Sequence, residues 1–294
     1  MEMDRERNLQ TVARYIQKMP SLPTSVTKVI ELSNDPNVSP ADLNHVISLD
    51  PVLMGKVMKL INSAYYGLNQ KVTSLVRAII MLGINTVKNL ALSTAVLGSI
   101  GKDSSFQALN LSGFWSHSLC VGVTSKLIAE KMGISPKERE SFFVAGLLHD
   151  LGKIPLNNTL SELYIQAMGL SDRENLPLFR SEYRVIGFTH AEAGKLIAKV
   201  WKLGEEIHDA LTYHHSYTNY QGPFKNIVYA VAAANYFANI YDIGFSGNRY
   251  PEPITEEALS HLGITMEWLE DTEEEVHREI DKARIFLKIE EQGK

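Results

Sequence analysis

The sequence predicts an all-α protein. Apolar residues recur at three- and four-residue steps in several segments, as on the buried face of a helix: 26–32, 43–49, 87–97, 119–128 and 142–148. No stretch shows sustained apolar-polar alternation, and no Asn-Gly or Asp-Gly hairpin turn occurs. The content of 45% hydrophobic and 21% charged residues is typical of a globular protein with a sizeable core.

Local signals predict where three of these helices begin. Ser-Pro dipeptides at Ser39 and Ser135 are each followed by an acidic residue three positions after the serine. This is the pattern of an N-cap, a proline at the first helical position and a capping acid. Asp50-Pro51 opens a third helix in the same manner, and that helix runs to a turn near Gly67. Helices are therefore expected to start at residues 40, 51 and 136.

Two irregular stretches divide the chain into three expected parts. Residues 101–105 form a small polar break between an N-terminal helical lobe, 1–105, and a helical core, 106–244. Residues 245–253 then separate the core from a C-terminal extension, 245–294. Within the extension, residues 267–290 place apolar side chains among acidic ones. That pattern predicts an amphipathic helix packed on the body with a solvated acidic face.

Charge and cysteine content narrow the function classes. The 294-residue chain has a net charge of −5, so it lacks the basic character expected for general nucleic-acid binding. Cys120 is the only cysteine, which excludes a disulfide framework. The charged N-terminus is unlike a signal peptide, and the most apolar stretch, 90–100, is about half as long as a membrane helix. A soluble, cytoplasmic protein without a membrane association is expected.

The candidate chemistry lies in the histidines. Imidazole and carboxylate ligands together suit iron, manganese and zinc, and a carboxylate can bridge two cations where one imidazole nitrogen cannot. Lys153 follows Asp150 by three residues and therefore projects from the same helix face. Five of the nine histidines fall in one region, and one of them precedes an aspartate at the end of an apolar helix: His117, His149-Asp150, His190 and His214-His215.

Ordinary structural roles are open for the same residues. His149 is flanked by leucines and can be a hydrogen-bonded core residue, His117 can pack beside aromatic rings, and His190 can serve as a helix N-terminal residue. A second His-Asp dipeptide, His208-Asp209, lies on a charged helix face, so the dipeptide alone is weak evidence. The remaining histidines are surrounded by polar residues and are expected to be solvated: His45, His261 and His277.

Several longer motifs resemble the bacterial HDOD domain, the "HD-related output domain" of the HD phosphohydrolase superfamily. The resemblance spans residues 20–216 and implies an all-helical fold and a signalling or regulatory setting. The matching stretches are Leu22-Pro23, Asp50-Pro51-Val52-Leu53, Leu60-Ile61-Asn62-Ser63-Ala64-Tyr65, Ala78-Ile79 through Leu82-Gly83, Phe143 through Lys153, Gly187 through Gly194, and Trp201-Lys202-Leu203.

The metal-ligand pattern is similar to that of the HD-GYP phosphodiesterases. The resemblance implies metal ligation by His117, His149, Asp150, His190, His214 and His215, with Asp150 bridging and with Lys153 and Asp150 in catalytic roles. Two features depart from the pattern. Asn235 stands where the family has a downstream Asp, and Asp242 lies about 10 Å further along the helix axis. The GYP loop after His215 is also missing.

These features predict one or two divalent transition-metal ions, with iron preferred and manganese or zinc as alternatives, and no organic cofactor. Two divalent ions and one carboxylate leave about three positive charges, which favours an anionic ligand. The expected function is a regulatory HDOD module with a signalling-protein partner. The alternative is a metal-dependent phosphohydrolase or phosphodiesterase that acts on a phosphate-containing ligand.

Overall fold

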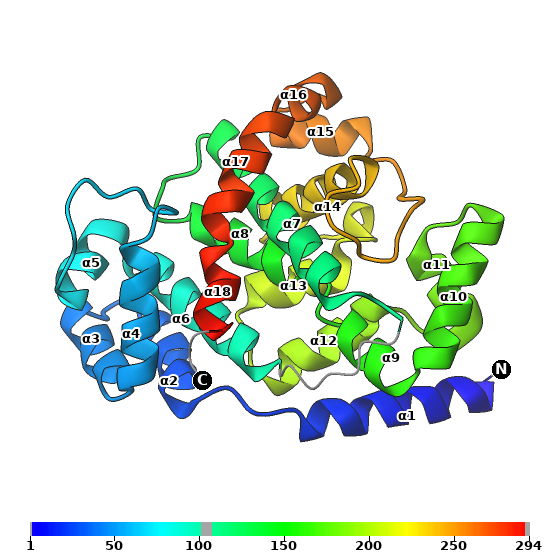
Figure 1. Ribbon diagram of the computed structural model, residues 1–294, viewed down its shortest axis with the longest axis horizontal. Coiled ribbons are helices and arrows are strands. Elements are labelled where there is room, and N and C mark those ends of the chain that lie inside the picture. The colour runs from blue at the N-terminus through cyan, green and yellow to red at the C-terminus, as the bar shows by residue number, and fades with distance from the viewer. Residues whose placement is uncertain (1, 101–107, 292–294) are drawn as a thin grey trace.

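The structure is a computed structural model that describes residues 2–100 and 108–291. Within these residues it contains helices and no β-strand, which confirms the expected fold class (Figure 1). The boundary expected at 101–105 lies outside the described residues. In chain order the helices are α1 (Glu2–Lys18), α2 (Thr24–Ser33), α3 (Pro40–Ser48), α4 (Pro51–Ile61), α5 (Leu75–Leu82), α6 (Ile84–Ser99), α7 (Leu111–Lys131), α8 (Arg139–Leu148), α9 (Lys153–Thr159), α10 (Ser161–Glu174), α11 (Leu178–Ile186), α12 (His190–Val200), α13 (Glu205–Tyr213), the 3-10 helix η1 (Tyr217–Asn219), α14 (Lys225–Ile240), α15 (Glu256–Leu262), α16 (Met266–Asp271), α17 (Glu273–Ala283) and α18 (Ile285–Glu291).

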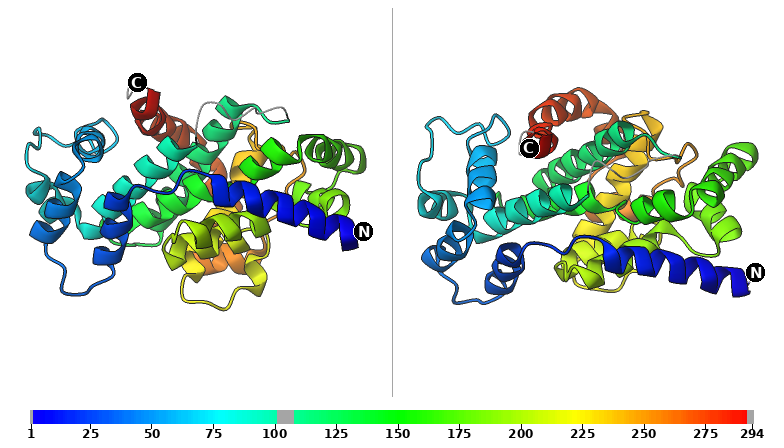
Figure 2. Two further views of the ribbon diagram at one scale, coloured as in Figure 1. Left: turned by 90° about the horizontal axis from the view of Figure 1, so that it is seen from below. Right: turned by 60° about the horizontal axis from the view of Figure 1, so that its bottom comes forward.

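Helices α2 to α5 form a lobe at one side of the molecule, and α6 runs from this lobe into the larger helical body (Figure 1). Figure 2 shows α1 lying along the outside of that body, where it packs on α9 and α12. Among the described helices, none is by itself long and apolar enough to cross a membrane. Helices α5 and α6 meet that criterion only as a pair, which is bent by 115°.

Two of the three predicted helix starts are confirmed. Ser39 forms a capping box at the start of α3, and the Asp50 side chain accepts a hydrogen bond from the Leu53 amide at the start of α4. The start predicted after Ser135 is wrong, because α8 begins at Arg139. The Ser135 carbonyl accepts hydrogen bonds from the backbone amides of Glu138 and Arg139 and closes a turn that precedes the helix.

The centre of the body is the contact between α7 and α8, where two glycines let the helices approach. A Cβ atom on Gly146 would lie 2.7 Å from the Val121 carbonyl oxygen, and one on Gly122 would lie 2.8 Å from the Phe143 carbonyl oxygen. Real Cβ atoms do not approach backbone this closely, so larger side chains would push the helices apart. This close packing fixes α8 against α7, so that His117 within α7 lies near His149 and Asp150, which follow the end of α8.

A buried polar cluster joins the N-terminal lobe to the body. The Lys126 ammonium group donates to the Tyr65 hydroxyl at 2.8 Å and to the Glu140 carboxylate at 3.0 Å. The Tyr65 hydroxyl in turn donates to Glu140 at 3.2 Å. The ring of Phe286 on α18 packs against both Tyr65 and Phe143. The tyrosine of the Asn-Ser-Ala-Tyr motif therefore connects the lobe, α7, α8 and the C-terminal helix.

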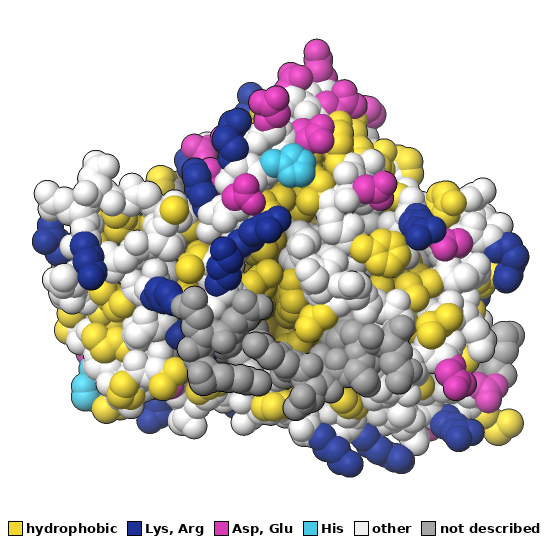
Figure 3. Space-filling model, in the orientation of Figure 1, with side chains coloured by type: hydrophobic (Ala, Val, Ile, Leu, Met, Phe, Trp, Pro, Cys, Tyr) yellow, Lys and Arg dark blue, Asp and Glu magenta, His cyan; other side chains and the backbone are white. Residues whose placement is uncertain are grey.

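The C-terminal extension packs on the body as expected but is not one continuous helix. It is divided into α16, α17 and α18, with breaks at Thr272 and Arg284. The Thr272 hydroxyl donates to carbonyl groups at the end of α16, which allows the helix axis to turn while the apolar side chains stay inward. Acidic side chains gather over α15 to α17 (Figure 3), as the sequence predicts. The buried apolar residues are Leu269, Val276, Ile280, Phe286 and Ile289.

Candidate metal centre

Four separate segments bring the six candidate ligands together. One comes from the middle of α7, two follow the end of α8, one begins α12 and two follow the end of α13. Five of the six are buried and His215 is half-buried. They form two groups in which the ligand atoms lie within 4.8 Å of one another: His117, His149 and Asp150, and His190, His214 and His215.

Asp150 stands between the two groups. Its Oδ2 atom lies 3.2 Å from Nε2 of His149 and 3.8 Å from Nε2 of His117. Its Oδ1 atom lies 3.2 Å from Nε2 of His190 and 3.8 Å from Nε2 of His214. One carboxylate oxygen thus faces each group, which is the arrangement that a bridging ligand requires.

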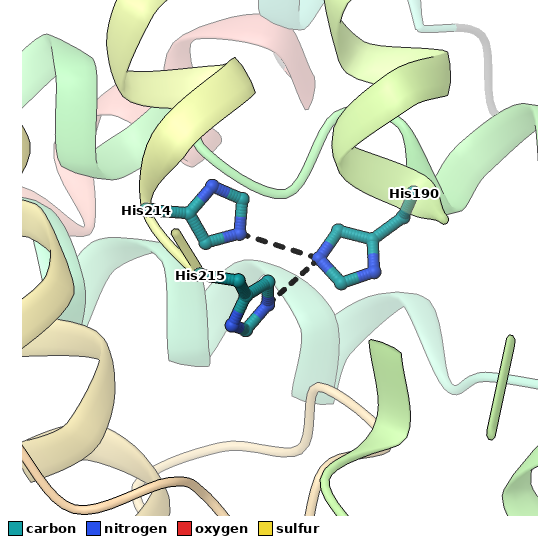
Figure 4. A group of neighbouring side chains, drawn as sticks. All are labelled: His190, His214 and His215. Atoms are coloured by element: carbon teal, nitrogen blue, oxygen red, sulfur yellow. Dashed lines mark hydrogen bonds between the residues drawn. The ribbon is translucent and has the colours of Figure 1, made fainter. Parts of the chain in front are cut away.

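The second group consists of three imidazole rings that converge through the same ring nitrogen (Figure 4). Nε2 of His190 lies 3.2 Å from Nε2 of His214 and 3.0 Å from Nε2 of His215. His215 is held in place by stacking on the Phe179 ring, with 4.5 Å between ring centroids. The three nitrogens point at a common centre from two different helix ends.

The outer ring nitrogens show which nitrogen is free to bind a cation. Nδ1 of His149 lies 2.7 Å from the Gly146 carbonyl oxygen, and Nδ1 of His214 lies 3.0 Å from the Ala210 carbonyl oxygen. Carbonyl oxygens only accept hydrogen bonds, so each Nδ1 carries the proton. In a neutral ring Nε2 then has a lone pair directed into the cluster. Metal-binding histidines are typically held in this way by an outer acceptor.

His190 has a stronger outer partner, the carboxylate of Glu182 on α11. This carboxylate is fully buried and accepts from Nδ1 of His190 at 2.7 Å and from the His190 backbone amide at 2.8 Å. Burial alone lowers the pKa of His190, but the negative charge of Glu182 outweighs that effect and raises the pKa above its usual value. Glu182 therefore orients the ring and makes Nε2 more basic.

The cluster also leaves buried lone pairs without hydrogen bonds. Nε2 of His149 and Oδ1 of Asp150 are both buried and form no hydrogen bond in the described structure. Leaving such atoms unpaired costs about 1–3 kcal/mol each, more for a charged group. A divalent cation would satisfy these atoms, so the residues present fit a metal ion.

Three of the histidines and the Asp150 carboxylate have pKa values that suit metal binding at neutral pH. Burial lowers the pKa of His117 to about 3, and burial with neighbouring histidines holds the pKa values of His214 and His215 well below the usual range. Burial by itself raises the pKa of Asp150, but His149 and Lys153 outweigh it and hold that pKa well below normal. These imidazoles are neutral and the carboxylate is ionised, as metal ligands must be.

Asn235 lies beside the first group. Its Oδ1 atom is 3.1 Å from Nε2 of His117 and accepts a hydrogen bond from the Asn239 amide at 2.8 Å. Asn235 thus offers a neutral oxygen at the edge of the cluster. Asp242 follows the end of α14, and its positive φ of 51° marks the turn that ends the helix.

Lys153 is turned inward. Its ammonium nitrogen lies 2.7 Å from Oδ2 of Asp150 and donates to the Ser246 carbonyl at 3.0 Å. The side chain is only 2% exposed. The two residues do not share a helix face as predicted, because Asp150 lies in the turn between α8 and α9 and Lys153 is the first residue of α9. The contact forms across this turn, and the ammonium group is engaged by the carboxylate and the carbonyl.

The ordinary roles considered for the histidines have mixed outcomes. His190 is the first residue of α12, yet its ring also reaches the cluster. The nearest polar groups to His117 are Asn235 and the His149-Asp150 pair. His208 pairs with its neighbour Asp209 at 2.9 Å and lies outside the cluster. The other three histidines are exposed, as expected: His45, His261 and His277.

Glu182 and Gly152 support the cluster. Glu182 escapes sequence reasoning, whereas the sequence suggests Gly152 for the backbone angles of a helix end, and the structure gives it an ordinary φ of −64°. Glu182 precedes His190 by eight residues and has no neighbouring motif that marks it. Gly152 matters through close approach, because a Cβ atom there would lie 1.8 Å from the His190 carbonyl oxygen and 2.5 Å from the Gly194 amide nitrogen. The chain after α8 therefore touches the start of α12 directly. This contact places Asp150 against His190.

Comparison with known proteins agrees with the helical architecture and with the sequence motifs. Residues 19–217, about two thirds of the chain, match the model of the HDOD domain. The chain belongs to the HDOD family. The motifs at Asp50-Pro51 and at His149-Asp150 both lie within the matched region.

Solved structures and a curated protein resemble this HDOD chain over most of its length. An HDOD domain protein of unknown function from Geobacter sulfurreducens is 26% identical, with 97% of this chain and 98% of that chain covered and a TM-score of 0.69. A proposed phosphohydrolase from Shewanella amazonensis is 20% identical, covers 96% and 97%, and has a TM-score of 0.67, which shows the shared fold. An uncharacterized Treponema pallidum protein is 25% identical over 257 residues, which are 87% of this chain. The chain spans about half the length of that curated relative.

Proposed function

We propose that this protein is a bacterial regulatory HDOD module whose helical body holds a dinuclear transition-metal centre. The observation that carries the proposal is Asp150, which directs one carboxylate oxygen at each of the two histidine groups. His117 and His149 would hold one ion, with Asn235 beside them, and the second histidine group would hold the other. We expect iron, with manganese or zinc as alternatives. When bound, the ions supply positive charge that attracts an anion.

The regulatory role is favoured over catalysis by the state of Lys153. A lysine that assists phosphoester hydrolysis must reach a substrate oxygen, yet this ammonium group is buried between Asp150 and the Ser246 carbonyl. The neutral Asn235 and the missing GYP loop point the same way. We therefore infer that the module acts through a signalling-protein partner.

A metal-dependent phosphohydrolase is the second candidate, favoured by the six candidate ligands that lie together in the two groups. In that case bound water would be the nucleophile and a phosphate-containing compound the substrate. The phosphohydrolase description of a 20% identical neighbour does not decide between the candidates, since a likeness at that level concerns the fold.

Metal analysis tests the proposed function. Protein reconstituted with iron, manganese or zinc should retain one or two ions per chain, and Asp150→Ala should lose most of them. His208→Ala, in the second His-Asp dipeptide, is the matched control and should retain them. Fewer than about 0.2 ions per wild-type chain would contradict the proposal.

An activity assay separates the two candidates. The metal-loaded protein should show negligible hydrolysis of cyclic dinucleotides, nucleotides and a chromogenic phosphodiester. Robust turnover that disappears in His149→Ala would establish an enzyme instead of a regulatory module.

A further inference from the structure

The segment that follows α14 lies beside the metal cluster. Residues 244–254, here called the strap, contain no helix and connect α14 to α15 (Figure 1). Four strap residues help to line a small cavity beside the second histidine group. Its lining consists of His214, His215, Tyr217, Ala232, Asn235, Tyr236, Asn248, Pro251, Glu252 and Ile254.

The strap is anchored at several points along its length. The Phe245 amide donates to the Gly113 carbonyl on α7 at 2.9 Å, and the Ser246 carbonyl accepts from Lys153. The Asn248 side chain accepts from the first amide of α11 at 3.1 Å. Glu252 forms an ion pair with Arg180 on α11. The strap is thus fixed to three helices of the body, two of which also support ligand residues.

The cavity under the strap is very small. Its volume is about 20 Å3. A cavity must offer roughly 10–15 Å3 by the same measure to hold one water molecule, whereas pockets for ordinary small-molecule ligands measure roughly 300–1,000 Å3. The space beside the cluster therefore admits a ligand of about the size of water. A phosphate group is several times larger.

The charge of the cavity lining, like the size of the cavity, disfavours a phosphate group. Among the described residues that line the cavity, Glu252 is the one with an acidic side chain. Arg180 offsets part of its charge from the side of α11, and the remaining negative charge disfavours a phosphoester, most strongly one with two negative charges. The loaded cluster itself still carries excess positive charge and attracts an anion. The small cavity, the Glu252 carboxylate and the positive charge of the loaded cluster together favour one small, singly charged anion.

From this arrangement, and resting on the proposed function, we infer that the strap closes the outer side of this cavity and limits the metal cluster to small monoanions such as hydroxide or fluoride. Pro251 and Glu252 are the specificity-determining residues, because they line the cavity and Glu252 supplies its negative charge. Phosphoesters are excluded as long as the strap remains in place.

Cobalt(II)-loaded full-length protein provides the test, because the visible absorption of cobalt responds to exchange of its ligands. Fluoride and inorganic phosphate are titrated separately into the wild type, Pro251→Gly and Glu252→Gln. Pro251→Ala and Glu252→Ala replace these variants if either does not fold. Glu267→Gln, an exposed change on α16, is the matched control. Circular dichroism verifies the helical content of each protein.

Fluoride should change the spectrum of every variant with similar affinity. Phosphate should bind the wild type and Glu267→Gln at least about tenfold more weakly than fluoride, and should gain about tenfold in affinity in the strap variants. Equal binding of both anions by the wild type, or no gain for phosphate in any folded strap variant, would overturn the inference. A failure to take up cobalt would instead contradict the proposed function and is recognised separately by elemental analysis.

Discussion

Replacement of Glu182 by glutamine tests whether the outer partner of His190 contributes to metal affinity. The carboxylate accepts two hydrogen bonds from His190, at 2.7 Å from Nδ1 and 2.8 Å from the backbone amide. Glutamine has a similar shape but one accepting oxygen and no charge. The imidazole of Glu182→Gln should therefore be less basic and less firmly oriented. Loss of such an outer partner typically weakens metal affinity about 10- to 100-fold.

The expected loss can be converted into two measurable quantities. A 10- to 100-fold change in affinity corresponds to about 1.4–2.7 kcal/mol. At saturating metal, the stabilisation of the folded protein decreases by the same amount. For a domain of about this size, 1 kcal/mol shifts the melting temperature by about 2–4 °C. The metal-induced increase in Tm should thus be about 3–10 °C smaller in Glu182→Gln.

Competition with a chromogenic chelator measures the affinity, and thermal unfolding with and without metal measures the stabilisation. Glu162→Gln is a suitable control, because Glu162 is an exposed carboxylate on α10, which packs against α11. If a folded Glu182→Gln protein binds metal within about twofold of the wild type, Glu182 has no role in orienting the ligand.

Three further predictions address the cluster edge, the packing and the thiol. Asn235→Asp places a carboxylate beside His117 and should tighten metal binding by about tenfold in the chelator assay; unchanged affinity would mean that this oxygen does not face a metal. Gly152→Ala should destabilise the fold by roughly 3 kcal/mol or more in urea unfolding, because its Cβ would meet backbone at 1.8 Å. Gly169→Ala, in open space on α10, should be neutral or stabilise by about 0.5–1 kcal/mol, and equal effects of the two changes would refute the close approach. Burial raises the pKa of Cys120 to about 12, so a thiol reagent at pH 8 should react only after unfolding, and rapid reaction in native conditions would contradict its burial.

Much of the fold could be predicted because its signals are local. The capping box at Ser39 and the cap at Asp50 depend on side-chain and backbone atoms within one helical turn, so the sequence contains all of the relevant contacts. The helix start predicted after Ser135 was wrong. The Ser135 carbonyl accepts hydrogen bonds in the same way in an isolated turn and in the first turn of a helix, so the local sequence does not distinguish the two. The single helix predicted over 267–290 is interrupted at Thr272, because the packing of the extension on the body decides where the helix axis bends.

The candidate ligands were also identifiable from the sequence, through residue types that suit metal binding and through motifs similar to those of a known family. The sequence could not show that their Nε2 atoms meet, because that depends on how closely α7 approaches α8 and on the contact between Gly152 and α12. Sequence reasoning left Lys153 in a catalytic role, whereas the fold places its ammonium group against Asp150 and the strap.

The sequence by itself determined the helical class of this protein, the start of two helices and the set of residues able to hold a metal. These properties follow from hydrophobic spacing, local hydrogen bonds and side-chain chemistry, which act over a few residues. The tertiary structure alone decided that Asp150 lies between two histidine groups, that Glu182 supports His190 and that the strap lines a cavity of about 20 Å3. Each of these depends on contacts between segments that are distant in the chain, and their geometry is fixed by the packing of the helices as a whole.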